Sequence, residues 1–451
     1  LGFLGFLGFL GFLGFLGFLG FLGFLGFLGF LGFLLSTLLA FPTNTYIEVI
    51  FKLLQSKPIS GLLTPLAFLL LLSACGGSPS AFPSAAALQA AGTTAAPVSN
   101  AGSSSTSLPA PPQPSAAPAS PTLTPERVIS PTLLVTHSKS DYVSFLDPAS
   151  GTYDKLVVGR APFAAALGPQ HRAYVTTAEG IAVIDTAMRK RLALVPYLSS
   201  VGANPRYGEY RAGGMGLAVS PDGKQVYVGV YLGSSASQLE ILDTDTLTMT
   251  ARVPVGMRPF DVVVAPDGHE VYSIDHDGYT VTAVDPKTRK SRTFEAAPFG
   301  KGGFEKPHYA AVTASGQLLL PYQGRGLVVL DPASGQYTVK PLTGNTHQEG
   351  VVLTDDGKQL LIVGIGAAGS ATGQPNLTVL DTATYTERIV PLTRLHQMVA
   401  VSPDAKTAYL TGGVTYADTG WNGMTVIDLT AGTAREIALP DYPLDVQVLQ
   451  E

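Results

Sequence analysis

The sequence predicts an all-β fold, a β-propeller of seven four-stranded blades, in the part of the chain that follows about residue 132. Three observations support this fold class. A motif of two apolar residues followed by Asp recurs seven times, at intervals of 38 to 58 residues. Pairs of alternating strands joined by tight turns precede these motifs, and short turns rich in Thr, Ser, Pro and Gly follow them. A four-stranded unit of about 40 to 50 residues is the sequence signature of a propeller blade.

The first segment, residues 1–51, opens with a Leu-Gly-Phe repeat that fills residues 1–33. A period of three matches neither the helix period nor the strand period, so the repeat specifies no core. We interpret residues 1–51 as a low-complexity upstream segment that does not belong to the native protein. The alternative is a membrane-inserting stretch, because the repeat is apolar enough to span a bilayer.

Residues 52–74 have the layout of a secretory signal peptide, with Lys52 and Lys57 before an apolar run and small residues at its end. Residues 72–75 (Leu-Ser-Ala-Cys) resemble the lipobox of bacterial lipoproteins, and this resemblance implies that Cys75 is lipidated and becomes the first residue of the processed chain. Cys75 is the single cysteine of the sequence, which excludes an intrachain disulfide and a cysteine-based zinc site. A lipid at Cys75 would hold the protein on a membrane surface without a spanning helix.

Residues 75–125 are rich in Ser, Ala and Pro. Such a composition buries too little apolar area to offset the entropy of the chain, so we expect a disordered tether. The tether would carry the propeller, residues 126–451, away from the membrane.

Each apolar-Asp motif ends a strand with an aspartate that precedes a turn. Because a carboxylate can accept hydrogen bonds from the N–H groups of its own turn, we expect these side chains to cap their turns. They occur once per blade and cannot converge on one point, which argues against a catalytic or calcium-binding role. The seven are Asp147, Asp185, Asp243, Asp285, Asp331, Asp381 and Asp428.

Three segments that precede an apolar-Asp strand resemble the YVTN-type β-propeller repeat family. They are residues 173–177 (Ala-Tyr-Val-Thr-Thr), 226–228 (Val-Tyr-Val) and 408–411 (Ala-Tyr-Leu-Thr). The resemblance covers roughly the last 320 residues and implies the fold, while saying little about function.

The two ends of the predicted propeller complement each other. Residues 443–448 (Pro-Leu-Asp-Val-Gln-Val) match residues 259–264 (Pro-Phe-Asp-Val-Val-Val), which we interpret as the innermost strand of a blade. The first unit starts at Thr132 and lacks such a strand. We therefore predict that the C-terminal strand completes the first blade and covers two otherwise open sheet edges.

The predicted insertions fall in two kinds of connection, those between the second and third strands of a blade and those between blades. These connections share one face of a propeller, which we call the long-loop face, and long loops in a compact domain are usually functional. The insertions are residues 232–238, 364–376, 412–423, 196–214 and 296–309.

Polar residues of these loops are the candidate ligand-binding residues, and most of them directly precede an innermost strand. The candidates are Arg160, Arg206, Arg211, Arg258, Lys306, His308, His347, Glu349, His396 and Trp421. Three of them, His308, His347 and His396, are also candidate ligands for zinc or copper. An anion or polar small-molecule pocket and plain solvated loops are the alternatives, and we predict no cofactor and no catalytic residue. We expect the other histidines, His137, His171, His269 and His276, on the surface.

Net charge and composition limit the possible partners. The net charge is −5 and 14% of the residues are charged, so the chain lacks the basic surface that binds nucleic-acid phosphates. We predict an extracytoplasmic protein of the cell envelope, lipid-anchored to the outer or plasma membrane, that binds a small molecule, a glycan or a protein partner at its long-loop face.

The alternative to a binding protein is an enzyme. Similar seven-bladed propellers include lactonase-like hydrolases, in which His308, His347, Glu349 and Arg258 would transfer protons, and subunits like the heavy chain of methylamine dehydrogenase. The sequence holds no compact set of acid, base and nucleophile, so we favour binding over catalysis.

Overall fold

The computed structural model describes residues 131–202, 206–208, 211–233, 237–303, 305–344, 349–365, 373–412 and 421–449. The signal segment, Cys75, the tether and His347 lie outside the described residues. Within them, no helix combines the length and the apolar character needed to cross a membrane.

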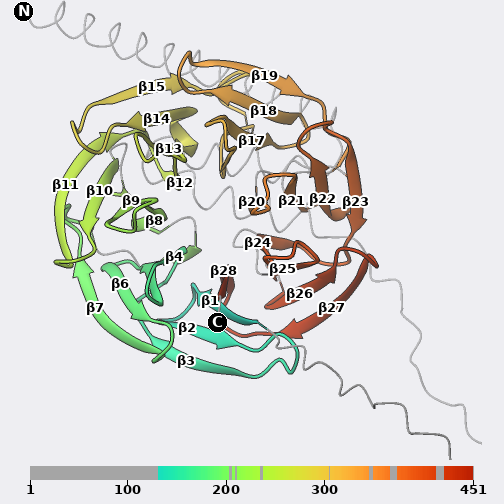
Figure 1. Ribbon diagram of the computed structural model, residues 1–451, viewed down its shortest axis with the longest axis horizontal. Coiled ribbons are helices and arrows are strands. Elements are labelled where there is room, and N and C mark those ends of the chain that lie inside the picture. The colour runs from blue at the N-terminus through green and yellow to red at the C-terminus, as the bar shows by residue number, and fades with distance from the viewer. Residues whose placement is uncertain are drawn as a thin grey trace, which may run out of the picture. The chain divides into compact units, whose positions relative to one another are not determined.

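The described residues form seven antiparallel four-stranded sheets arranged in a ring (Figure 1). We number these blades from the N-terminus, and the predicted fold class is confirmed. Blade 1 consists of β28 (Pro443–Leu449), β1 (Thr132–His137), β2 (Tyr142–Leu146) and β3 (Tyr153–Val157). Blade 2 consists of β4 (Ala165–Gly168), β5 (Arg172–Thr176), β6 (Gly180–Asp185) and β7 (Lys190–Pro196). Blade 3 consists of β8 (Gly213–Val219), β9 (Gln225–Tyr231), β10 (Ser237–Asp243) and β11 (Thr248–Val255).

The remaining blades repeat this order from the innermost to the outermost strand. Blade 4 consists of β12 (Pro259–Val264), β13 (Val271–Asp275), β14 (Thr280–Val284) and β15 (Ser291–Glu295), with the 3-10 turn η3 (His276–Gly278) between β13 and β14. Blade 5 consists of β16 (Ala311–Val312), β17 (Leu318–Tyr322), β18 (Gly326–Asp331) and β19 (Gln336–Lys340). Blade 6 consists of β20 (Val351–Leu353), β21 (Gln359–Ile365), β22 (Pro375–Asp381) and β23 (Glu387–Pro391). Blade 7 consists of β24 (His396–Val401), β25 (Thr407–Gly412), β26 (Gly423–Asp428) and β27 (Thr433–Ala438).

The hydrophobic core lies between the blades. In the described part of the chain, each of the seven interfaces between neighbouring blades holds a buried apolar cluster. The middle strands, such as β2 and β17, are buried on both faces, whereas the outermost strands, such as β3 and β19, carry exposed polar residues. Each fully buried Val, Leu or Ile contributes about 1.5–3 kcal/mol, so the middle strands supply most of the hydrophobic stabilisation.

The C-terminal strand closes the ring, as predicted. Strand β28 pairs antiparallel with β1, with Leu134 opposite Gln447 and Val135 opposite Val446. Beside this pairing, the Tyr142 hydroxyl donates a hydrogen bond of 2.8 Å to Asp441, just before β28. The first and last parts of the propeller therefore share one sheet.

The seven repeated aspartates have the structural role that the sequence predicts. Asp147 accepts a hydrogen bond of 2.8 Å from the N–H of Ala149, and Asp381 accepts bonds from Ala383 and Thr384 at 3.0 and 2.8 Å. The other five accept from N–H groups two or three residues ahead in the same way. These bonds favour the ionised carboxylate, and they lower the pKa of Asp381.

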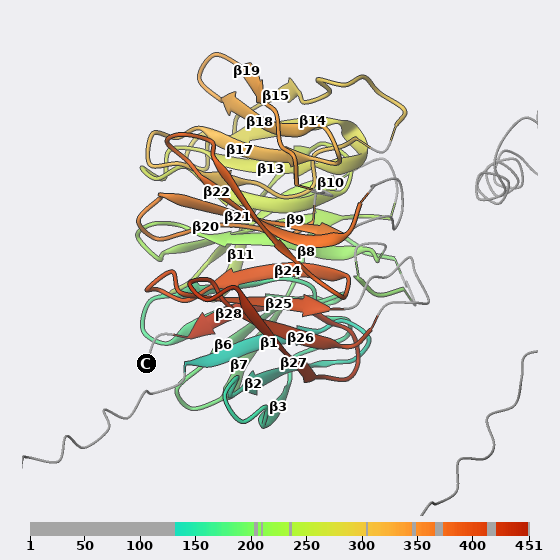
Figure 2. The same cartoon turned by 90° about the vertical axis from the view of Figure 1, so that its right-hand side faces the viewer.

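The connections lie on two opposite faces of the ring, which Figure 2 shows from the side. Turns between the first and second strands and between the third and fourth strands are short, as at residues 220–224 and 332–335. We call their side of the ring the short-turn face. The blade-to-blade connections, including residues 296–303 and 305–310, lie on the long-loop face together with η3.

Candidate binding site at the mouth of the channel

Four apolar residues from blades 1 to 4 meet where the innermost strands begin on the long-loop face. Leu444, Phe163, Met215 and Phe260 belong to one buried cluster that also contains Tyr231 and Tyr442. Because the four come from different blades, they meet only near the axis of the ring. We call these four residues the apolar floor, and the region beside it on the long-loop face the mouth.

A carboxylate in η3 organises the charged groups on one side of the mouth. Asp277 lies 3.1 Å from Nε of Arg258, 2.9 Å from Nζ of Lys306 and 2.8 Å from Nδ1 of His276. Arg258 and Lys306 come from the connections that flank blade 4, so Asp277 joins three segments of chain. We call these four side chains the Asp277 cluster, and they are only 12–22% exposed.

The protonation states in the Asp277 cluster follow from burial and partners. Burial lowers the pKa of His276 to about 4, which the hydrogen bond with Asp277 offsets only in part, so the ring is neutral at pH 7 and donates through Nδ1. Burial alone would raise the pKa of Asp277, but the hydrogen bonds from His276 and Lys306 and the charge of Arg258 outweigh it and lower that pKa well below its usual range. Asp277 is therefore ionised, and Arg258 and Lys306 are the charges that balance it.

Three rings in mutual contact connect the Asp277 cluster to the floor. The ring of His276 stacks on Phe260 at 4.4 Å and contacts His308 at 4.1 Å, while Phe260 and His308 meet edge to face at 4.8 Å. The expectation that His276 lies on the surface is wrong, since tertiary packing places η3 against β12. The same expectation is wrong for His137, which is fully buried and hydrogen-bonded to the Pro440 carbonyl at 2.7 Å, whereas His171 and His269 are exposed.

A second set of polar residues forms the opposite side of the mouth, and we call it the Glu349 network. Nε2 of Gln397 donates to Glu349, and the hydroxyl of Tyr442 donates to Oε1 of Gln397 at 3.2 Å. The three residues come from blades 6, 7 and 1, and all are buried. Burial raises the pKa of Glu349 to about 8, and the hydrogen bond from Gln397 offsets only part of this rise, so the carboxyl is mostly protonated at pH 7.

The other predicted site residues have varied surroundings. Arg160 pairs with Glu179 at 3.4 Å, and Arg206 is exposed. Arg211 is 0% exposed and donates to the carbonyls of Ala161 and Ala212 at 2.7 and 3.2 Å, and burial lowers its pKa to about 10. Arg211 therefore lies inside the protein, where it holds backbone segments together.

The candidate metal ligands have different neighbours. His308 contacts Phe260 and His276 of blade 4, whereas Nε2 of His396 lies 2.8 Å from Oγ1 of Thr425 in its own blade. Trp421 covers the edge of His396 and donates through Nε1 to the Leu395 carbonyl at 3.0 Å. Within the described ranges, no group of three or more His, Cys, Asp or Glu residues could hold a metal ion.

The sequence missed Asp277, His276, Phe260 and Tyr442 as residues of the mouth. One available signal was the repeat itself, because Tyr442 precedes Pro443 just as Arg258 precedes Pro259. Both residues have a positive φ, 59° and 57°, before an innermost strand. Aligning the blades at these prolines would have placed Tyr442 beside Arg258 among the candidates.

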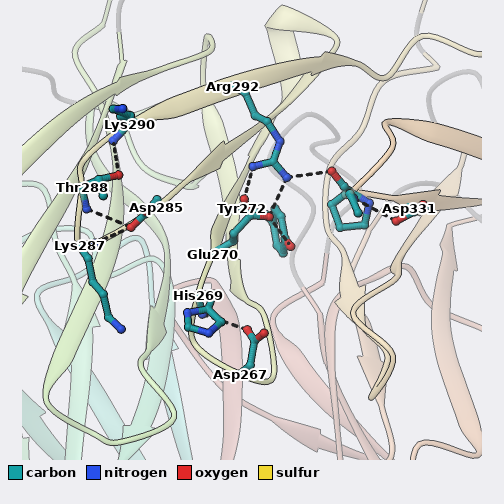
Figure 3. Close-up of polar contacts among 12 residues, drawn as sticks. Asp267, His269, Glu270, Tyr272, Asp285, Lys287, Thr288, Lys290, Arg292 and Asp331 are labelled. Carbon is teal, nitrogen blue, oxygen red and sulfur yellow. Dashed lines mark hydrogen bonds and ion pairs between the residues drawn. The ribbon is translucent and has the colours of Figure 1, made fainter.

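A separate polar groove lies on the short-turn face between blades 4 and 5 (Figure 3), with a cavity volume of about 620 Å³. Its charged groups bind one another and the backbone. Arg292 pairs with Glu270 and donates to the Pro332 carbonyl of blade 5 at 2.9 Å, while Asp285 accepts from the N–H of Lys287 at 2.8 Å.

The same arrangement occurs between blades 7 and 1, where Arg435 donates to the Pro148 carbonyl beside a second groove. In both places an arginine of the outermost strand binds the Asp-Pro-Ala-Ser-Gly turn of the next blade. This repetition indicates that Arg292 and Arg435 hold neighbouring blades together.

The fold defines the class of protein, a seven-bladed β-propeller. No protein-family model matches the chain, and no curated protein matches it either. The chain is similar to a functionally unknown protein from Desulfotomaculum acetoxidans, with 12% identity, a TM-score of 0.52, and coverage of 71% of this chain and 99% of that chain. It is also similar to the periplasmic gluconolactonase of Pseudomonas aeruginosa, with 16% identity, a TM-score of 0.51, and coverage of 71% and 99%.

A third similar structure is the hydrazine synthase of Kuenenia stuttgartiensis, with 17% identity, a TM-score of 0.50, and coverage of 71% of this chain and 98% of that chain. At these identities the similarity shows the fold alone. Membership of the YVTN-type repeat family stays a prediction.

Proposed function

We propose that this protein is a lipid-anchored, extracytoplasmic β-propeller that binds a small polar molecule at the mouth on its long-loop face. The Glu349 network is the observation that carries this proposal. It joins a carboxyl, an amide and a phenol hydroxyl from three blades beside an apolar floor. Ligand sites typically combine apolar surface with a few convergent polar groups of this kind.

A pair of glutamine variants tests the binding site. Gln397→Leu removes the central amide of the Glu349 network, whereas Gln336→Leu makes the same change at an exposed position of β19. We expect a small polar compound found by thermal-shift screening to stabilise the wild type and the Gln336→Leu variant but not the Gln397→Leu variant. A ligand that stabilises all three proteins equally would place the binding site elsewhere.

A second candidate function is hydrolysis of a sugar lactone at the same mouth. Glu349 favours it, because a carboxyl with a pKa of about 8 is suited to exchange protons near neutral pH. The structurally similar gluconolactonase motivates the choice of substrate. Turnover of a lactone that is lost in Glu349→Gln would support the enzyme, and absence of turnover at high protein concentration would leave the binding protein.

A protein partner or a glycan at the long-loop face remains compatible with the proposal. The mouth favours a small ligand, because its polar groups converge on the axis of the ring rather than spreading over the face. The proposed attachment to the membrane depends on Cys75.

A further inference from the structure

The mouth has two sides of different chemistry that border the same floor. The Asp277 cluster supplies charged groups around blade 4, and the Glu349 network supplies neutral hydrogen-bonding groups from blades 6, 7 and 1. Phe260 contacts His276 and shares the floor with Tyr442, so each side meets the floor through one of its members.

The charged side carries a formal excess of positive charge within its four members. Arg258 and Lys306 are cations, Asp277 is the one carboxylate of the cluster, and His276 is neutral, which leaves a formal charge of +1. The side chains are mostly buried, so solvent screens this charge less than it would on an open surface. A partly buried cluster of this sign attracts an anion.

The two cations are also held in fixed positions. Asp277 binds both of them, the ring of Tyr231 lies 5.1 Å from the guanidinium of Arg258, and the ring of Tyr279 lies 5.4 Å from Nζ of Lys306. Cations that are ordered in advance lose little side-chain entropy when a ligand binds. The cluster is therefore a suitable anchor for the charged end of a ligand.

The Glu349 network suits hydroxyl groups rather than a second charge. Its carboxyl, amide and phenol groups offer both donors and acceptors, and burial keeps the carboxyl protonated near pH 7, so it does not repel an anion. Its members are buried at the inner ends of blades 6, 7 and 1, and Tyr442 belongs to the same apolar cluster as Phe260.

We infer that the mouth selects a small hydroxylated monocarboxylate, with the carboxylate at Arg258 and Lys306 and the hydroxyls at the Glu349 network. This inference rests on the proposed binding function and names its ligand class. The formal charge of +1 on the Asp277 cluster matches a single negative charge on the ligand. The Glu349 network is neutral, so it can accommodate the hydroxylated part of the ligand without repelling it.

Three probes with the same six-carbon polyhydroxy chain test the inference. Gluconate carries one negative charge, glucitol is neutral, and glucamine carries one positive charge. We expect calorimetric titration of the full-length protein in detergent at pH 7 to show binding of gluconate, at least about tenfold weaker binding of glucitol, and no binding of glucamine, since each factor of ten corresponds to about 1.4 kcal/mol.

Two lysine variants separate the anchor from the general charge of the protein. Lys306→Met should weaken gluconate binding at least about tenfold. Lys301→Met, on the same connection but with an exposed side chain that pairs with Glu295, should leave it unchanged. If Lys306→Met does not fold, the wild type still tests the inference, because binding to the anchor should weaken as salt rises from about 20 to about 200 mM.

The outcomes distinguish the inference from the proposed function. Equal binding of gluconate and glucitol that is lost in Gln397→Leu would overturn the selection of anions and leave a binding mouth. Salt-independent binding of gluconate, or full binding by a folded Lys306→Met variant, would also overturn the inference. Failure of all three probes would overturn it too, whereas failure of the whole compound screen would remove the proposed function itself.

Discussion

At the scale of single residues, burial raises the pKa of several carboxyl groups inside the ring. Burial raises the pKa of Asp445 to about 7 and that of Asp261 to about 6, although each accepts backbone hydrogen bonds that partly offset the rise. The two occupy equivalent positions in β28 and β12. Asp445 accepts from Ala165 of the next blade at 2.7 Å and Asp261 accepts from Ala310 at 3.0 Å, so each carboxyl links two blades.

Glu349→Gln should change how the stability of the protein depends on pH. The folded-state pKa of Glu349 is about 8 and its ordinary value is 4.5, so the folded protein keeps a proton that the unfolded chain has lost between these values. The free energy of unfolding of the wild type therefore falls as pH rises through this interval, by about 1.4 kcal/mol per unit from this group. The glutamine side chain cannot ionise, so the variant does not lose stability from this position as pH rises. Its free energy of unfolding relative to the wild type should therefore rise from about pH 5 to about pH 8.

Urea denaturation of both proteins across this pH range measures the difference. The other buried groups that titrate, including Asp261, Asp445 and His276, are present in both proteins and largely cancel. Glu295→Gln, which removes an exposed carboxylate, is the control and should run parallel to the wild type. Parallel profiles for wild type and Glu349→Gln would show that Glu349 ionises normally in the folded protein.

At the scale of elements, the entry into three of the innermost strands places residues of the mouth. Ala161, Arg258 and Tyr442 adopt φ values of 50°, 57° and 59°, and each precedes a proline and an apolar residue of the floor. A left-handed residue without a glycine costs about 1 kcal/mol, which the packing of the floor must offset. This turn brings the side chains of Arg258 and Tyr442 to the mouth.

Removing the last seven residues should destabilise the whole propeller. The truncation deletes most of β28, including Val446, which pairs with Val135, and Asp445, which links β28 to β4. It leaves an open edge on β1 and exposes the apolar cluster between blades 7 and 1. We expect the melting temperature to fall by about 10 °C or more, or the protein not to fold.

Thermal melting followed by circular dichroism measures this effect. A control that lacks only residues 450 and 451 keeps all of β28 and should melt like the full chain. A melt of the seven-residue truncation that matches the full chain would mean that ring closure contributes little to stability.

At the scale of the whole molecule, the ring separates the mouth from the predicted point of attachment. Strand β1 is the second strand of its blade, so it starts on the short-turn face, and β28 ends there. A tether that ends before Thr132 would therefore join the propeller on the face opposite the mouth.

Cys75→Ser tests the proposed attachment. In a bacterial expression host, the wild type should incorporate labelled palmitate and sediment with the membranes, whereas the variant should do neither. The propeller of the variant should melt like that of the wild type, because residue 75 lies outside it. Membrane association that persists in Cys75→Ser would indicate another anchor, for which the apolar segments before residue 72 are the candidates.

The sequence by itself determined the architecture of this protein. Blade number, turn caps and ring closure depend on local, repeated signals, such as the apolar-Asp motif and the match between residues 443–448 and 259–264. Such signals predict structure because each one acts within a few residues along the chain. The sequence also predicts the long-loop face, because its position follows from the blade pattern. The same pattern places Arg258, Lys306, His308 and Glu349 there.

Only the tertiary structure decided what these side chains do. His276 stacks on Phe260 and contacts His308, Arg211 is buried among carbonyls, and Glu349 accepts a hydrogen bond from Gln397, which accepts one from Tyr442 of a third blade. Their partners lie far away along the chain, and burial and hydrogen bonding set the pKa values. A repeat pattern specifies where a residue lies in its blade, but the packing of the blades around the axis determines which residues it contacts.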